Sequence, residues 1–594
     1  MTEDDTEPDE TSAETDGGTT TQQEDIYTSE GRGKEYRDSV YYEVDNDSLE
    51  EAPNTSTYPR NEGGSSFRIT EMPKVPKISH IVGPSAIMLG ASLGSGETMF
   101  WPTIIAEGSW GLYWAFWVGV LTQFFINTEL QRWTIATGES IFGAFNRLSG
   151  FWPWFFLIFG FFQVGWPGWA ASGSEVFAAW TGIVPRAEWW IIGVISVAVI
   201  WLSYQAGPVV YNIVENAQIV LMFVAIAFAV VLVFLLGTIG ELVNLPGGAV
   251  NFGALPADDD FDIATFLGGL AYAGAGGYVN LSQGVWAREK GYGMGGYQGR
   301  VKNPLRGSGD PEQISEGYTF EPTETNLKRW KAWWKLTQQE HFLTFVVGLL
   351  IVATIAMTIS ARFAGGQDFG GDGVTMWLDT IIPALGGGLG SWMLYALLFI
   401  ALFSTQYAIT EVFVRNSADI IYQKVPSVGA NDMGRVFLGL LTVFALWGVL
   451  IIAGSGLFGW SQPWILLVIG AAAAGVMMWP YNALTIILNT TRLPEHLQPG
   501  WGRVVAMWWA TGFFGYFSVL LIGAQLAGPV AGATTPALGT FNTSAAVIGS
   551  GAGGYLLWVF ALVVQVYTMY VSGRAKLDAS GTVEDADEAQ GFLA

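Results

Sequence analysis

A few carboxylates that interrupt long apolar runs are the residues best placed to do chemistry. Glu97 lies within Gly94-Ser95-Gly96-Glu97, near the middle of an apolar run over 84–106. Four more glutamates lie inside or at the ends of other apolar runs: Glu129, Glu175, Glu215 and Glu411. If these runs cross a membrane, each carboxylate is costly to bury and is therefore a candidate for function.

The glycines beside Glu97 indicate a cation site. Gly94 and Gly96 flank Ser95 at mid-helix, where the backbone can unwind and free its carbonyl oxygens. A carboxylate beside freed carbonyls offers hard oxygen ligands to Mg²⁺, Mn²⁺, Na⁺ or H⁺. The alternative is a close helix crossing at the glycines, with Glu97 held in a buried hydrogen bond.

A second glycine-rich segment lies in the sixth apolar run, over 263–287. It contains Gly268-Gly269 and Gly274-Ala275-Gly276-Gly277, followed by Tyr278 and Asn280. Interrupted helices in the corresponding positions of an inverted repeat mark the binding site of many secondary transporters. We therefore expect the first and sixth spans to break and to face each other at mid-membrane. Tight packing of a glycine-rich helix is the alternative.

The composition places these residues in a membrane protein. Of 594 residues, 51% are hydrophobic and only 13% charged, about half the charge usual in soluble domains. The chain has 27 Trp and 76 Gly, residues that favour membrane interfaces and close helix packing. A large soluble enzyme with a Trp-rich core would not contain a dozen separate apolar runs, each of about bilayer length.

Several classes of site are excluded. The chain has no Cys and three His, so it contains no thiolate metal site, no Cys nucleophile and no site built from several His. The formal net charge of −24 disfavours nucleic-acid binding and fits a halophilic composition. No phosphate loop, nucleophile elbow or metalloprotease motif is present, so we do not expect an enzyme.

Twelve apolar runs predict an all-α polytopic membrane protein in the cell membrane, embedded in the lipid bilayer. They lie near 84–106, 110–134, 153–181, 189–205, 213–236, 263–287, 341–361, 390–413, 434–454, 464–488, 504–526 and 547–571. Lys and Arg gather in the even-numbered connections, most densely in 289–339, whereas the odd-numbered connections are mainly acidic. The positive-inside rule then places both termini and 289–339 in the cytoplasm.

The sequence is predicted to divide into an N-terminal tail, a transporter domain and a short C-terminal tail. Residues 1–66 carry nineteen acidic and four basic residues and few aliphatic ones, so 1–76 is predicted to be a disordered cytoplasmic tail. The transmembrane domain is predicted over 77–573 and a short cytoplasmic tail over 574–594. Trp330, Trp333 and Trp334 lie among basic residues and predict a helix along the headgroups.

The order of spans, the glycine-rich break in the first, and Ile135-Ala136-Thr137-Gly138-Glu139 after the second resemble the Nramp metal transporters. The resemblance runs from about Pro84 to the end of the last span. It implies the LeuT-type fold, a five-plus-five inverted repeat with broken helices 1 and 6, and proton-coupled uptake of a divalent metal. The metal would be the substrate, and no resident cofactor is implied.

The family's ligand motifs are only partly present. Its first-span Asp-Pro-Gly-Asn corresponds here to Gly94, Ser95, Gly96 and Glu97, so Glu97 replaces the Asn and the Asp is missing. Its sixth-span Met-Pro-His corresponds to Tyr278, Val279 and Asn280, without the soft Met ligand. A third-span Glu that handles protons in the family corresponds to Glu175. The resemblance thus implies a binding site formed by Gly94, Ser95, Glu97, Gly277, Tyr278 and Asn280.

Two main functions follow from these observations. The first is a secondary active transporter of a divalent metal cation, coupled to protons, with Glu97 as ligand and Glu175 as the proton-handling group. Without the Met thioether, such a site loses its preference for softer metals. The alternative is a transporter of an amino acid or another small organic solute, because Gly94-Ser95-Gly96 is similar to the Gly-Ser-Gly turn of amino-acid permeases. Glu97 argues against it, since it would repel a substrate carboxylate. A membrane sensor or scaffold is a third class, and no output domain supports it.

Overall fold

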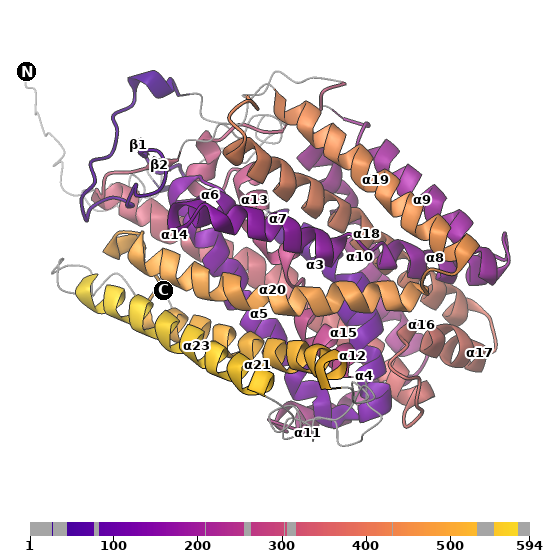
Figure 1. Cartoon of the computed structure of the whole chain (residues 1–594). Coiled ribbons are helices and arrows are strands. Elements are labelled where there is room, and N and C mark those ends of the chain that lie inside the picture. Colours follow the sequence, from indigo (N-terminus) through magenta and orange to yellow (C-terminus); the bar gives the residue numbers. More distant parts are fainter. Residues whose placement is uncertain are drawn as a thin grey trace, which may run out of the picture.

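The apolar runs form helices that pack side by side in one bundle (Figure 1). The computed structural model describes residues 26–27, 44–76, 82–207, 209–254, 263–301, 303–305, 317–429, 432–531 and 552–579. Within these residues, eight continuous helical stretches are long and apolar enough to cross a membrane. They are Arg186–Ser203, Val210–Leu235, Glu324–Ala364, Leu389–Lys424, Met433–Phe458, Pro463–Thr491, Trp501–Ile522 and Leu556–Ala579.

The helices of these eight spans have the following bounds: α9 Trp189–Ser203, α10 Val210–Leu235, α14 Glu324–His341 continuing into α15 Val347–Ala364, α18 Leu389–Lys424, α19 Met433–Phe458, α20 Pro463–Thr491, α21 Trp501–Ala531 and α23 Ala552–Ala579. A π-helical turn, η8 Phe342–Val346, joins α14 to α15. The other four predicted spans are interrupted or more polar: α3 Pro84–Ser92 with α4 Trp101–Gly108, α5 Tyr113–Thr137, α7 Phe151–Val164 with α8 Gly168–Thr181, and α12 Ile263–Ala271 with α13 Tyr278–Lys290. All twelve predicted spans therefore correspond to helices.

Short elements fill the connections and the region before the first span. They are η1 Asn46–Ser48, β1 Arg68–Ile69, η4 Trp110–Leu112, α6 Ile141–Leu148, η5 Arg186–Glu188, η6 Thr238–Asn244, α11 Leu245–Ala249, η7 Gly293–Tyr297, β2 Tyr318–Thr319, α16 Gly373–Thr375, η9 Met376–Ile381, α17 Ile382–Ala384 and η11 Glu495–Leu497. In Figure 1 the β1–β2 pair and α6 lie at one end of the bundle and α17 lies at the other.

The outer helices expose apolar side chains along their length. Val443 and Leu446 of α19 and Phe223 of α10 are each more than 60% exposed. Soluble proteins rarely leave such continuous apolar surface in water, whereas a bilayer covers it. The exposed apolar faces identify a multi-span membrane protein.

The first span departs from a regular α-helix where the glycines predicted a break. Between α3 and α4 the chain forms a π-helical segment, η3 Leu93–Phe100, which contains Glu97. The expectation that this stretch unwinds is therefore wrong in detail, since the backbone stays helical in a wider turn. Such π-helical turns are rare and often occur at functional sites.

The sixth span breaks as predicted. Helix α12 ends at Ala271, α13 begins at Tyr278, and Gly274, Gly276 and Gly277 between them all have positive φ. Residues with a side chain rarely adopt this backbone conformation, which explains why the break is made of glycines.

The segment that precedes the first span is ordered over 44–76, contrary to the predicted disorder. Phe67, Met72 and Val75 are buried, and β1 pairs with β2 in the sixth connection. A few apolar side chains are enough to hold this segment in place because they are buried against the bundle that the spans form. Of the predicted tails, residues 1–25, 28–43 and 580–594 lie outside the described part of the chain.

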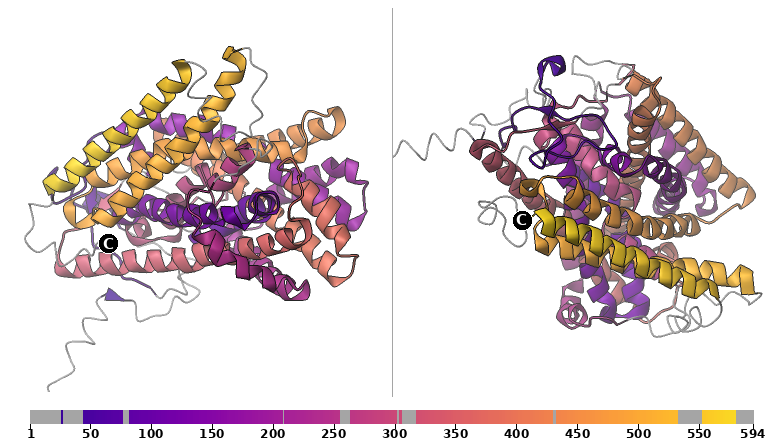
Figure 2. Two further views of the ribbon diagram at one scale, coloured as in Figure 1. Left: turned by 90° about the horizontal axis from the view of Figure 1, so that it is seen from below. Right: turned by 60° about the vertical axis from the view of Figure 1, so that its left-hand side comes forward.

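The tryptophans of α14 also differ from the prediction. Trp330, Trp333 and Trp334 are buried in protein, and Trp333 Nε1 donates to Pro73 O at 2.8 Å. Helix α14 runs directly into α15 as one long helix, visible in the left view of Figure 2. The helix is a packed extension of the seventh span, so it does not lie along the headgroups.

Candidate functional site

The π-helical segment of the first span touches the break in the sixth. Gly274 N donates to Glu97 Oε1 at 3.2 Å, and Glu97 is completely buried. The two interruptions therefore face each other within hydrogen-bonding distance, as the paired glycine clusters predicted.

Two glycines of η3 allow this close approach. A Cβ atom on Gly96 would lie 1.6 Å from Tyr272 O, and one on Gly94 would lie 2.5 Å from Ala401 O of α18. The first span is thus packed between the sixth and the eighth. Gly94 N donates to Thr405 Oγ1 of α18 at 2.8 Å, so this amide is not free for a ligand. The side chain of Ser95 lies outside the described part of the chain.

Two glutamines hold the backbone of the break. Gln123 of α5 donates to Ala271 O at 2.8 Å and accepts from Gly276 N at 3.1 Å. Gln163 of α7 accepts from Tyr278 N at 2.6 Å, which caps the first turn of α13, and donates to Gly276 O at 3.3 Å. These bonds supply partners that the interrupted helix lacks, as the absence of water in a membrane requires.

The other sixth-span candidates lie in the same shell but do not contact Glu97 directly. Asn280 donates to Gln123 Oε1 at 3.3 Å and to the hydroxyl of Tyr481, on α20, at 3.0 Å. The ring of Tyr278 packs where a Cβ on Gly160 would lie, and Gly277 sits against Gln163. In this conformation Gly277, Tyr278 and Asn280 shape the break, while Glu97 supplies its carboxylate.

Unused oxygen atoms gather at the junction. Glu97 Oε2 and Asn280 Oδ1 are buried and have no hydrogen-bond partner among the described residues. The carbonyls of Tyr272, Ala273 and Gly274 likewise accept no hydrogen bond within this part of the chain. An array of acceptors without donors suits a hard cation or a proton. Among the described residues no group of three His, Cys, Asp or Glu could hold a metal, so Glu97 is the site's one carboxylate.

Glu175 lies elsewhere. It is on α8 and pairs with Arg186 through an Oε1–Nε contact of 2.8 Å, and Arg186 also pairs with Asp379. The structure does not bring Glu175 to Glu97. It places Glu175 in a partly exposed ion-pair chain between the third and seventh connections.

The remaining span glutamates form ion pairs at the opposite end of the bundle. Glu129 contacts Arg132 at 2.9 Å and Arg503 at 3.1 Å, and Glu215 contacts Lys290 at 2.5 Å. Glu411 pairs with Arg415. These carboxylates are neutralised by basic partners, whereas Glu97 forms no ion pair with any described residue.

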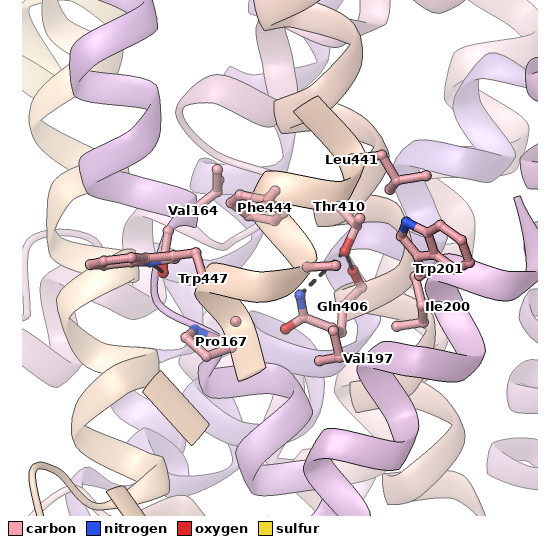
Figure 3. Close-up of a pocket in the computed structure, with 13 residues that line it drawn as sticks. Val164, Pro167, Val197, Ile200, Trp201, Gln406, Thr410, Leu441, Phe444 and Trp447 are labelled. Carbon is pink, nitrogen blue, oxygen red and sulfur yellow. Dashed lines mark hydrogen bonds between the residues drawn. The ribbon is translucent and has the colours of Figure 1, made fainter. Parts of the chain in front are cut away.

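A small cavity lies between the connection from α7 to α8 and helices α9, α18 and α19 (Figure 3). It measures about 20 Å³ and is lined mainly by apolar side chains, with Gln406 and Thr410 as its polar members. That volume holds about one water molecule. The cavity does not include Glu97 and has no charged side chain in its lining, so it is not a site for the cation.

Sequence reasoning missed Gln123, Gln163 and Thr405, although each leaves a signal. All three are polar side chains within apolar runs, and the argument that selected Glu97 applies to them in weaker form. Their hydrogen-bond partners are backbone atoms of other spans. The local sequence therefore cannot show which backbone atoms these side chains bind.

Comparison with known proteins identifies the fold. No protein-family model and no curated protein sequence matches the chain. Two structures of a manganese transporter from Eremococcus coleocola, one of a mutant and one with an aromatic bis-isothiourea substituted compound, match with TM-scores of 0.58 and 0.59. Both are 12% identical, and each match covers 85% of this chain and 98–99% of the other. The structure of MhsT in complex with L-phenylalanine matches with a TM-score of 0.41, too low to carry an argument.

At this identity the likeness shows the fold alone. The chain has the LeuT-type transporter fold, all-α and membrane-spanning, with interruptions in the first and sixth spans. The two of these solved structures that match with TM-scores above 0.5 are both of that manganese transporter.

Proposed function

We propose that the protein is a secondary active transporter, not an enzyme, and that its substrate is a divalent metal cation bound at Glu97. The observation that carries the proposal is Glu97 Oε2, a fully buried carboxylate oxygen without a partner, beside the free carbonyls of the sixth-span break. A bare charge at that depth is too costly, so Glu97 holds either a cation or a proton.

The donor set favours a hard cation. One carboxylate, one amide oxygen and backbone carbonyls suit Mg²⁺ or Mn²⁺ and lack the thiolate, thioether or imidazole that softer metals prefer. Of the described His residues, neither His341 nor His496 contacts Glu97. We therefore expect weak discrimination among divalent cations of suitable size.

The organic-solute alternative has less support from the geometry. A substrate carboxylate would need free amides in the Gly94-Ser95-Gly96 turn, and Gly94 N is already bonded to Thr405. Glu97 would also repel such a substrate.

The proposed setting is the cell membrane, with both termini and the basic connections in the cytoplasm. In that orientation Glu175 and Arg186 face outward. We propose that protons are the coupling ion and that Glu175 handles them on this side, as the family resemblance implies.

Uptake into proteoliposomes tests the proposal. Mn²⁺, Mg²⁺, Ca²⁺ and a panel of amino acids would be compared with and without a pH gradient, for the wild type and Glu97→Gln. We expect Mn²⁺ or Mg²⁺ uptake that a pH gradient stimulates and that Glu97→Gln abolishes, with unchanged expression and monodispersity. Full metal uptake by Glu97→Gln would place the site elsewhere, and amino-acid uptake unaltered by this substitution would favour the organic solute.

A further inference from the structure

A second buried polar cluster lies where the first span begins, and its hydrogen bonds form a continuous chain. His341 Nδ1 lies 2.9 Å from Ser85 Oγ, and the Ser85 hydroxyl donates to Glu340 Oε2. All three residues are buried. Ser85 opens α3, whereas Glu340 and His341 close α14, so the chain links the first span to the seventh.

The neighbouring amides fix the direction of these bonds. Asn127 Nδ2 of α5 lies 3.2 Å from His341 Nε2, and Gln283 Nε2 of α13 lies 3.5 Å from His341 Nδ1. The shorter contact assigns Nε2 as the acceptor and leaves the ring proton on Nδ1. Gln283 Nε2 of α13 also donates to Ser85 Oγ, at 3.3 Å. The order of donation is therefore from His341 to Ser85 and from Ser85 to Glu340.

Among the amides and the acid of this cluster, some acceptor oxygens lack a hydrogen-bond partner, whereas the amide nitrogens each have one. Glu340 Oε1, Gln283 Oε1 and Asn127 Oδ1 are buried and have no hydrogen-bond partner among the described residues. Buried polar atoms usually have a partner, so these three acceptor oxygens can receive additional hydrogen bonds, and Glu340 among them can take a proton.

The same two helices connect this cluster to Glu97. Asn127 follows Gln123 by four residues on α5, and Gln283 follows Asn280 by three on α13, so each pair lies on one helix face about one turn, ~5 Å, apart. Gln123 and Asn280 contact each other at the break, and Gly274 there donates to Glu97. The two hydrogen-bonded groups therefore lie about one helix turn apart on both α5 and α13.

We propose that His341, Ser85 and Glu340 form the proton relay of this transporter, at the end of the bundle that the charge pattern assigns to the cytoplasm. The inference rests on the proposed proton coupling. A proton arriving at His341 Nε2 is matched by transfer of the Nδ1 proton to Ser85 Oγ, while the Ser85 proton passes to Glu340 Oε2. The imidazole is then neutral again, and Glu340 is a neutral acid. Asn127 accommodates the change by turning its amide so that Oδ1 accepts from Nε2.

The groups around Glu340 fit a site that alternates between two protonation states. Lys290 of α13 faces it but is paired with Glu215 of α10, and Tyr211 of α10 is the other titratable neighbour. The Ser85 hydroxyl, in the first turn of α3, donates to the Glu340 carboxylate. Glu340 therefore has a donor that stabilises its anion, and no described residue forms an ion pair with it that would keep it permanently charged.

Proteoliposomes with a trapped pH dye test the relay. We expect Glu340→Gln and Ser85→Ala to reduce Mn²⁺-coupled proton influx by about tenfold or more, a threshold below the ~10²–10⁴-fold that a positioned proton-transfer group contributes. Mn²⁺ binding to the purified protein should stay within about twofold of wild type, because Glu97 is untouched. His496→Gln is the matched control for His341→Gln, since His496 lies outside the cluster. Wild-type proton influx in both Glu340→Gln and His341→Gln would overturn the relay.

A substrate-free measurement separates this inference from the proposed function. Infrared difference spectra of the purified protein between acidic and alkaline pH should contain a protonated-carboxyl band that Glu340→Gln removes and His496→Gln retains. If the wild type moves no metal under any gradient, the proposed metal function fails, and this band still decides whether Glu340 takes a proton. The same band in wild type and Glu340→Gln would overturn the relay, even in a protein that transports Mn²⁺. Size-exclusion profiles confirm that each variant is folded, and Ser85→Ala provides the second route should Glu340→Gln fail to fold.

Discussion

Replacing Gly96 by alanine perturbs the contact on which the whole site depends. The new methyl carbon would lie 1.6 Å from the carbonyl oxygen of Tyr272, and 2.6 Å from its carbonyl carbon. Both atoms belong to the backbone, so no side chain can rotate away. A normal carbon–oxygen contact is about 3.3 Å, roughly the C···O separation of even the close Cα–H···O contacts, so the first and sixth spans would need to separate by well over 1 Å.

The cost follows from overpacking. Inserting one methyl group into a packed interior costs ~1–3 kcal/mol when neighbours can adjust, and backbone on both sides makes the upper end or more the expected value. A matched control exists in α19, where a Cβ on Gly439 would meet nothing within 4 Å. There the same substitution should be neutral or stabilise the helix by up to ~1 kcal/mol, because alanine is the better helix former. Each variant adds the same CH₂ group to the wild-type chain, but the two variants should change stability in opposite directions.

Thermal unfolding of the detergent-solubilised protein, followed by fluorescence size exclusion, measures the difference. We expect Gly96→Ala to unfold at a lower temperature than wild type and to lose Mn²⁺ binding, because the bond from Gly274 to Glu97 breaks when the spans separate. Gly439→Ala should unfold at or above the wild-type temperature and bind normally. Equal melting temperatures for the two variants would refute the close contact between Gly96 and Tyr272.

Two further predictions concern the polar groups that hold the bundle. Glu129→Gln removes an acid that contacts both Arg132 and Arg503, and should lower stability by ~3–5 kcal/mol, whereas Asp432→Asn at an exposed pair should cost under ~1 kcal/mol. Denaturation of the two variants side by side checks this, and similar losses would show that the buried pair is not special. Gln163→Leu leaves Tyr278 N without its acceptor and should cost ~1–3 kcal/mol. It should also speed hydrogen exchange at the first turn of α13, and unchanged exchange there would mean that Gln163 is not its cap.

The spans and the two interruptions could be predicted because their signals are local. An apolar run of bilayer length has few other interpretations, and Gly274, Gly276 and Gly277 adopt the positive φ that only glycine tolerates easily. The form of the first interruption could not be predicted. Gly94 and Gly96 are equally compatible with an unwound chain and with a π-helical turn packed against Tyr272, and the neighbouring spans decide between them.

The ion-pair and hydrogen-bond partners of the candidate residues could not be predicted for the same reason. Glu129 and Arg503 are 374 residues apart, and Ser85 and His341 are 256 apart. Charge counts suggested which connections lie together, but not which carboxylate meets which guanidinium. Composition also misled at 44–76, where an acidic average concealed the three apolar anchors Phe67, Met72 and Val75.

Ion pairs close both ends of the bundle, but the pairs at one end are more deeply buried than those at the other. This difference affects which end can open towards Glu97. Near Ser85 the pairs are buried: Glu129 with Arg132 and Arg503, Arg288 with Asp419, and Glu289 and Glu411 with Arg415. At the other end the chain from Glu175 through Arg186 to Asp379 is partly exposed, with Arg186 37% and Asp379 49% accessible. Separating a buried pair leaves an uncompensated charge, whereas solvent compensates an exposed one. The end with Glu175 therefore opens at lower cost. In the proposed orientation that end is the outside, so the proposed uptake would let an external cation reach Glu97 before the inner pairs part.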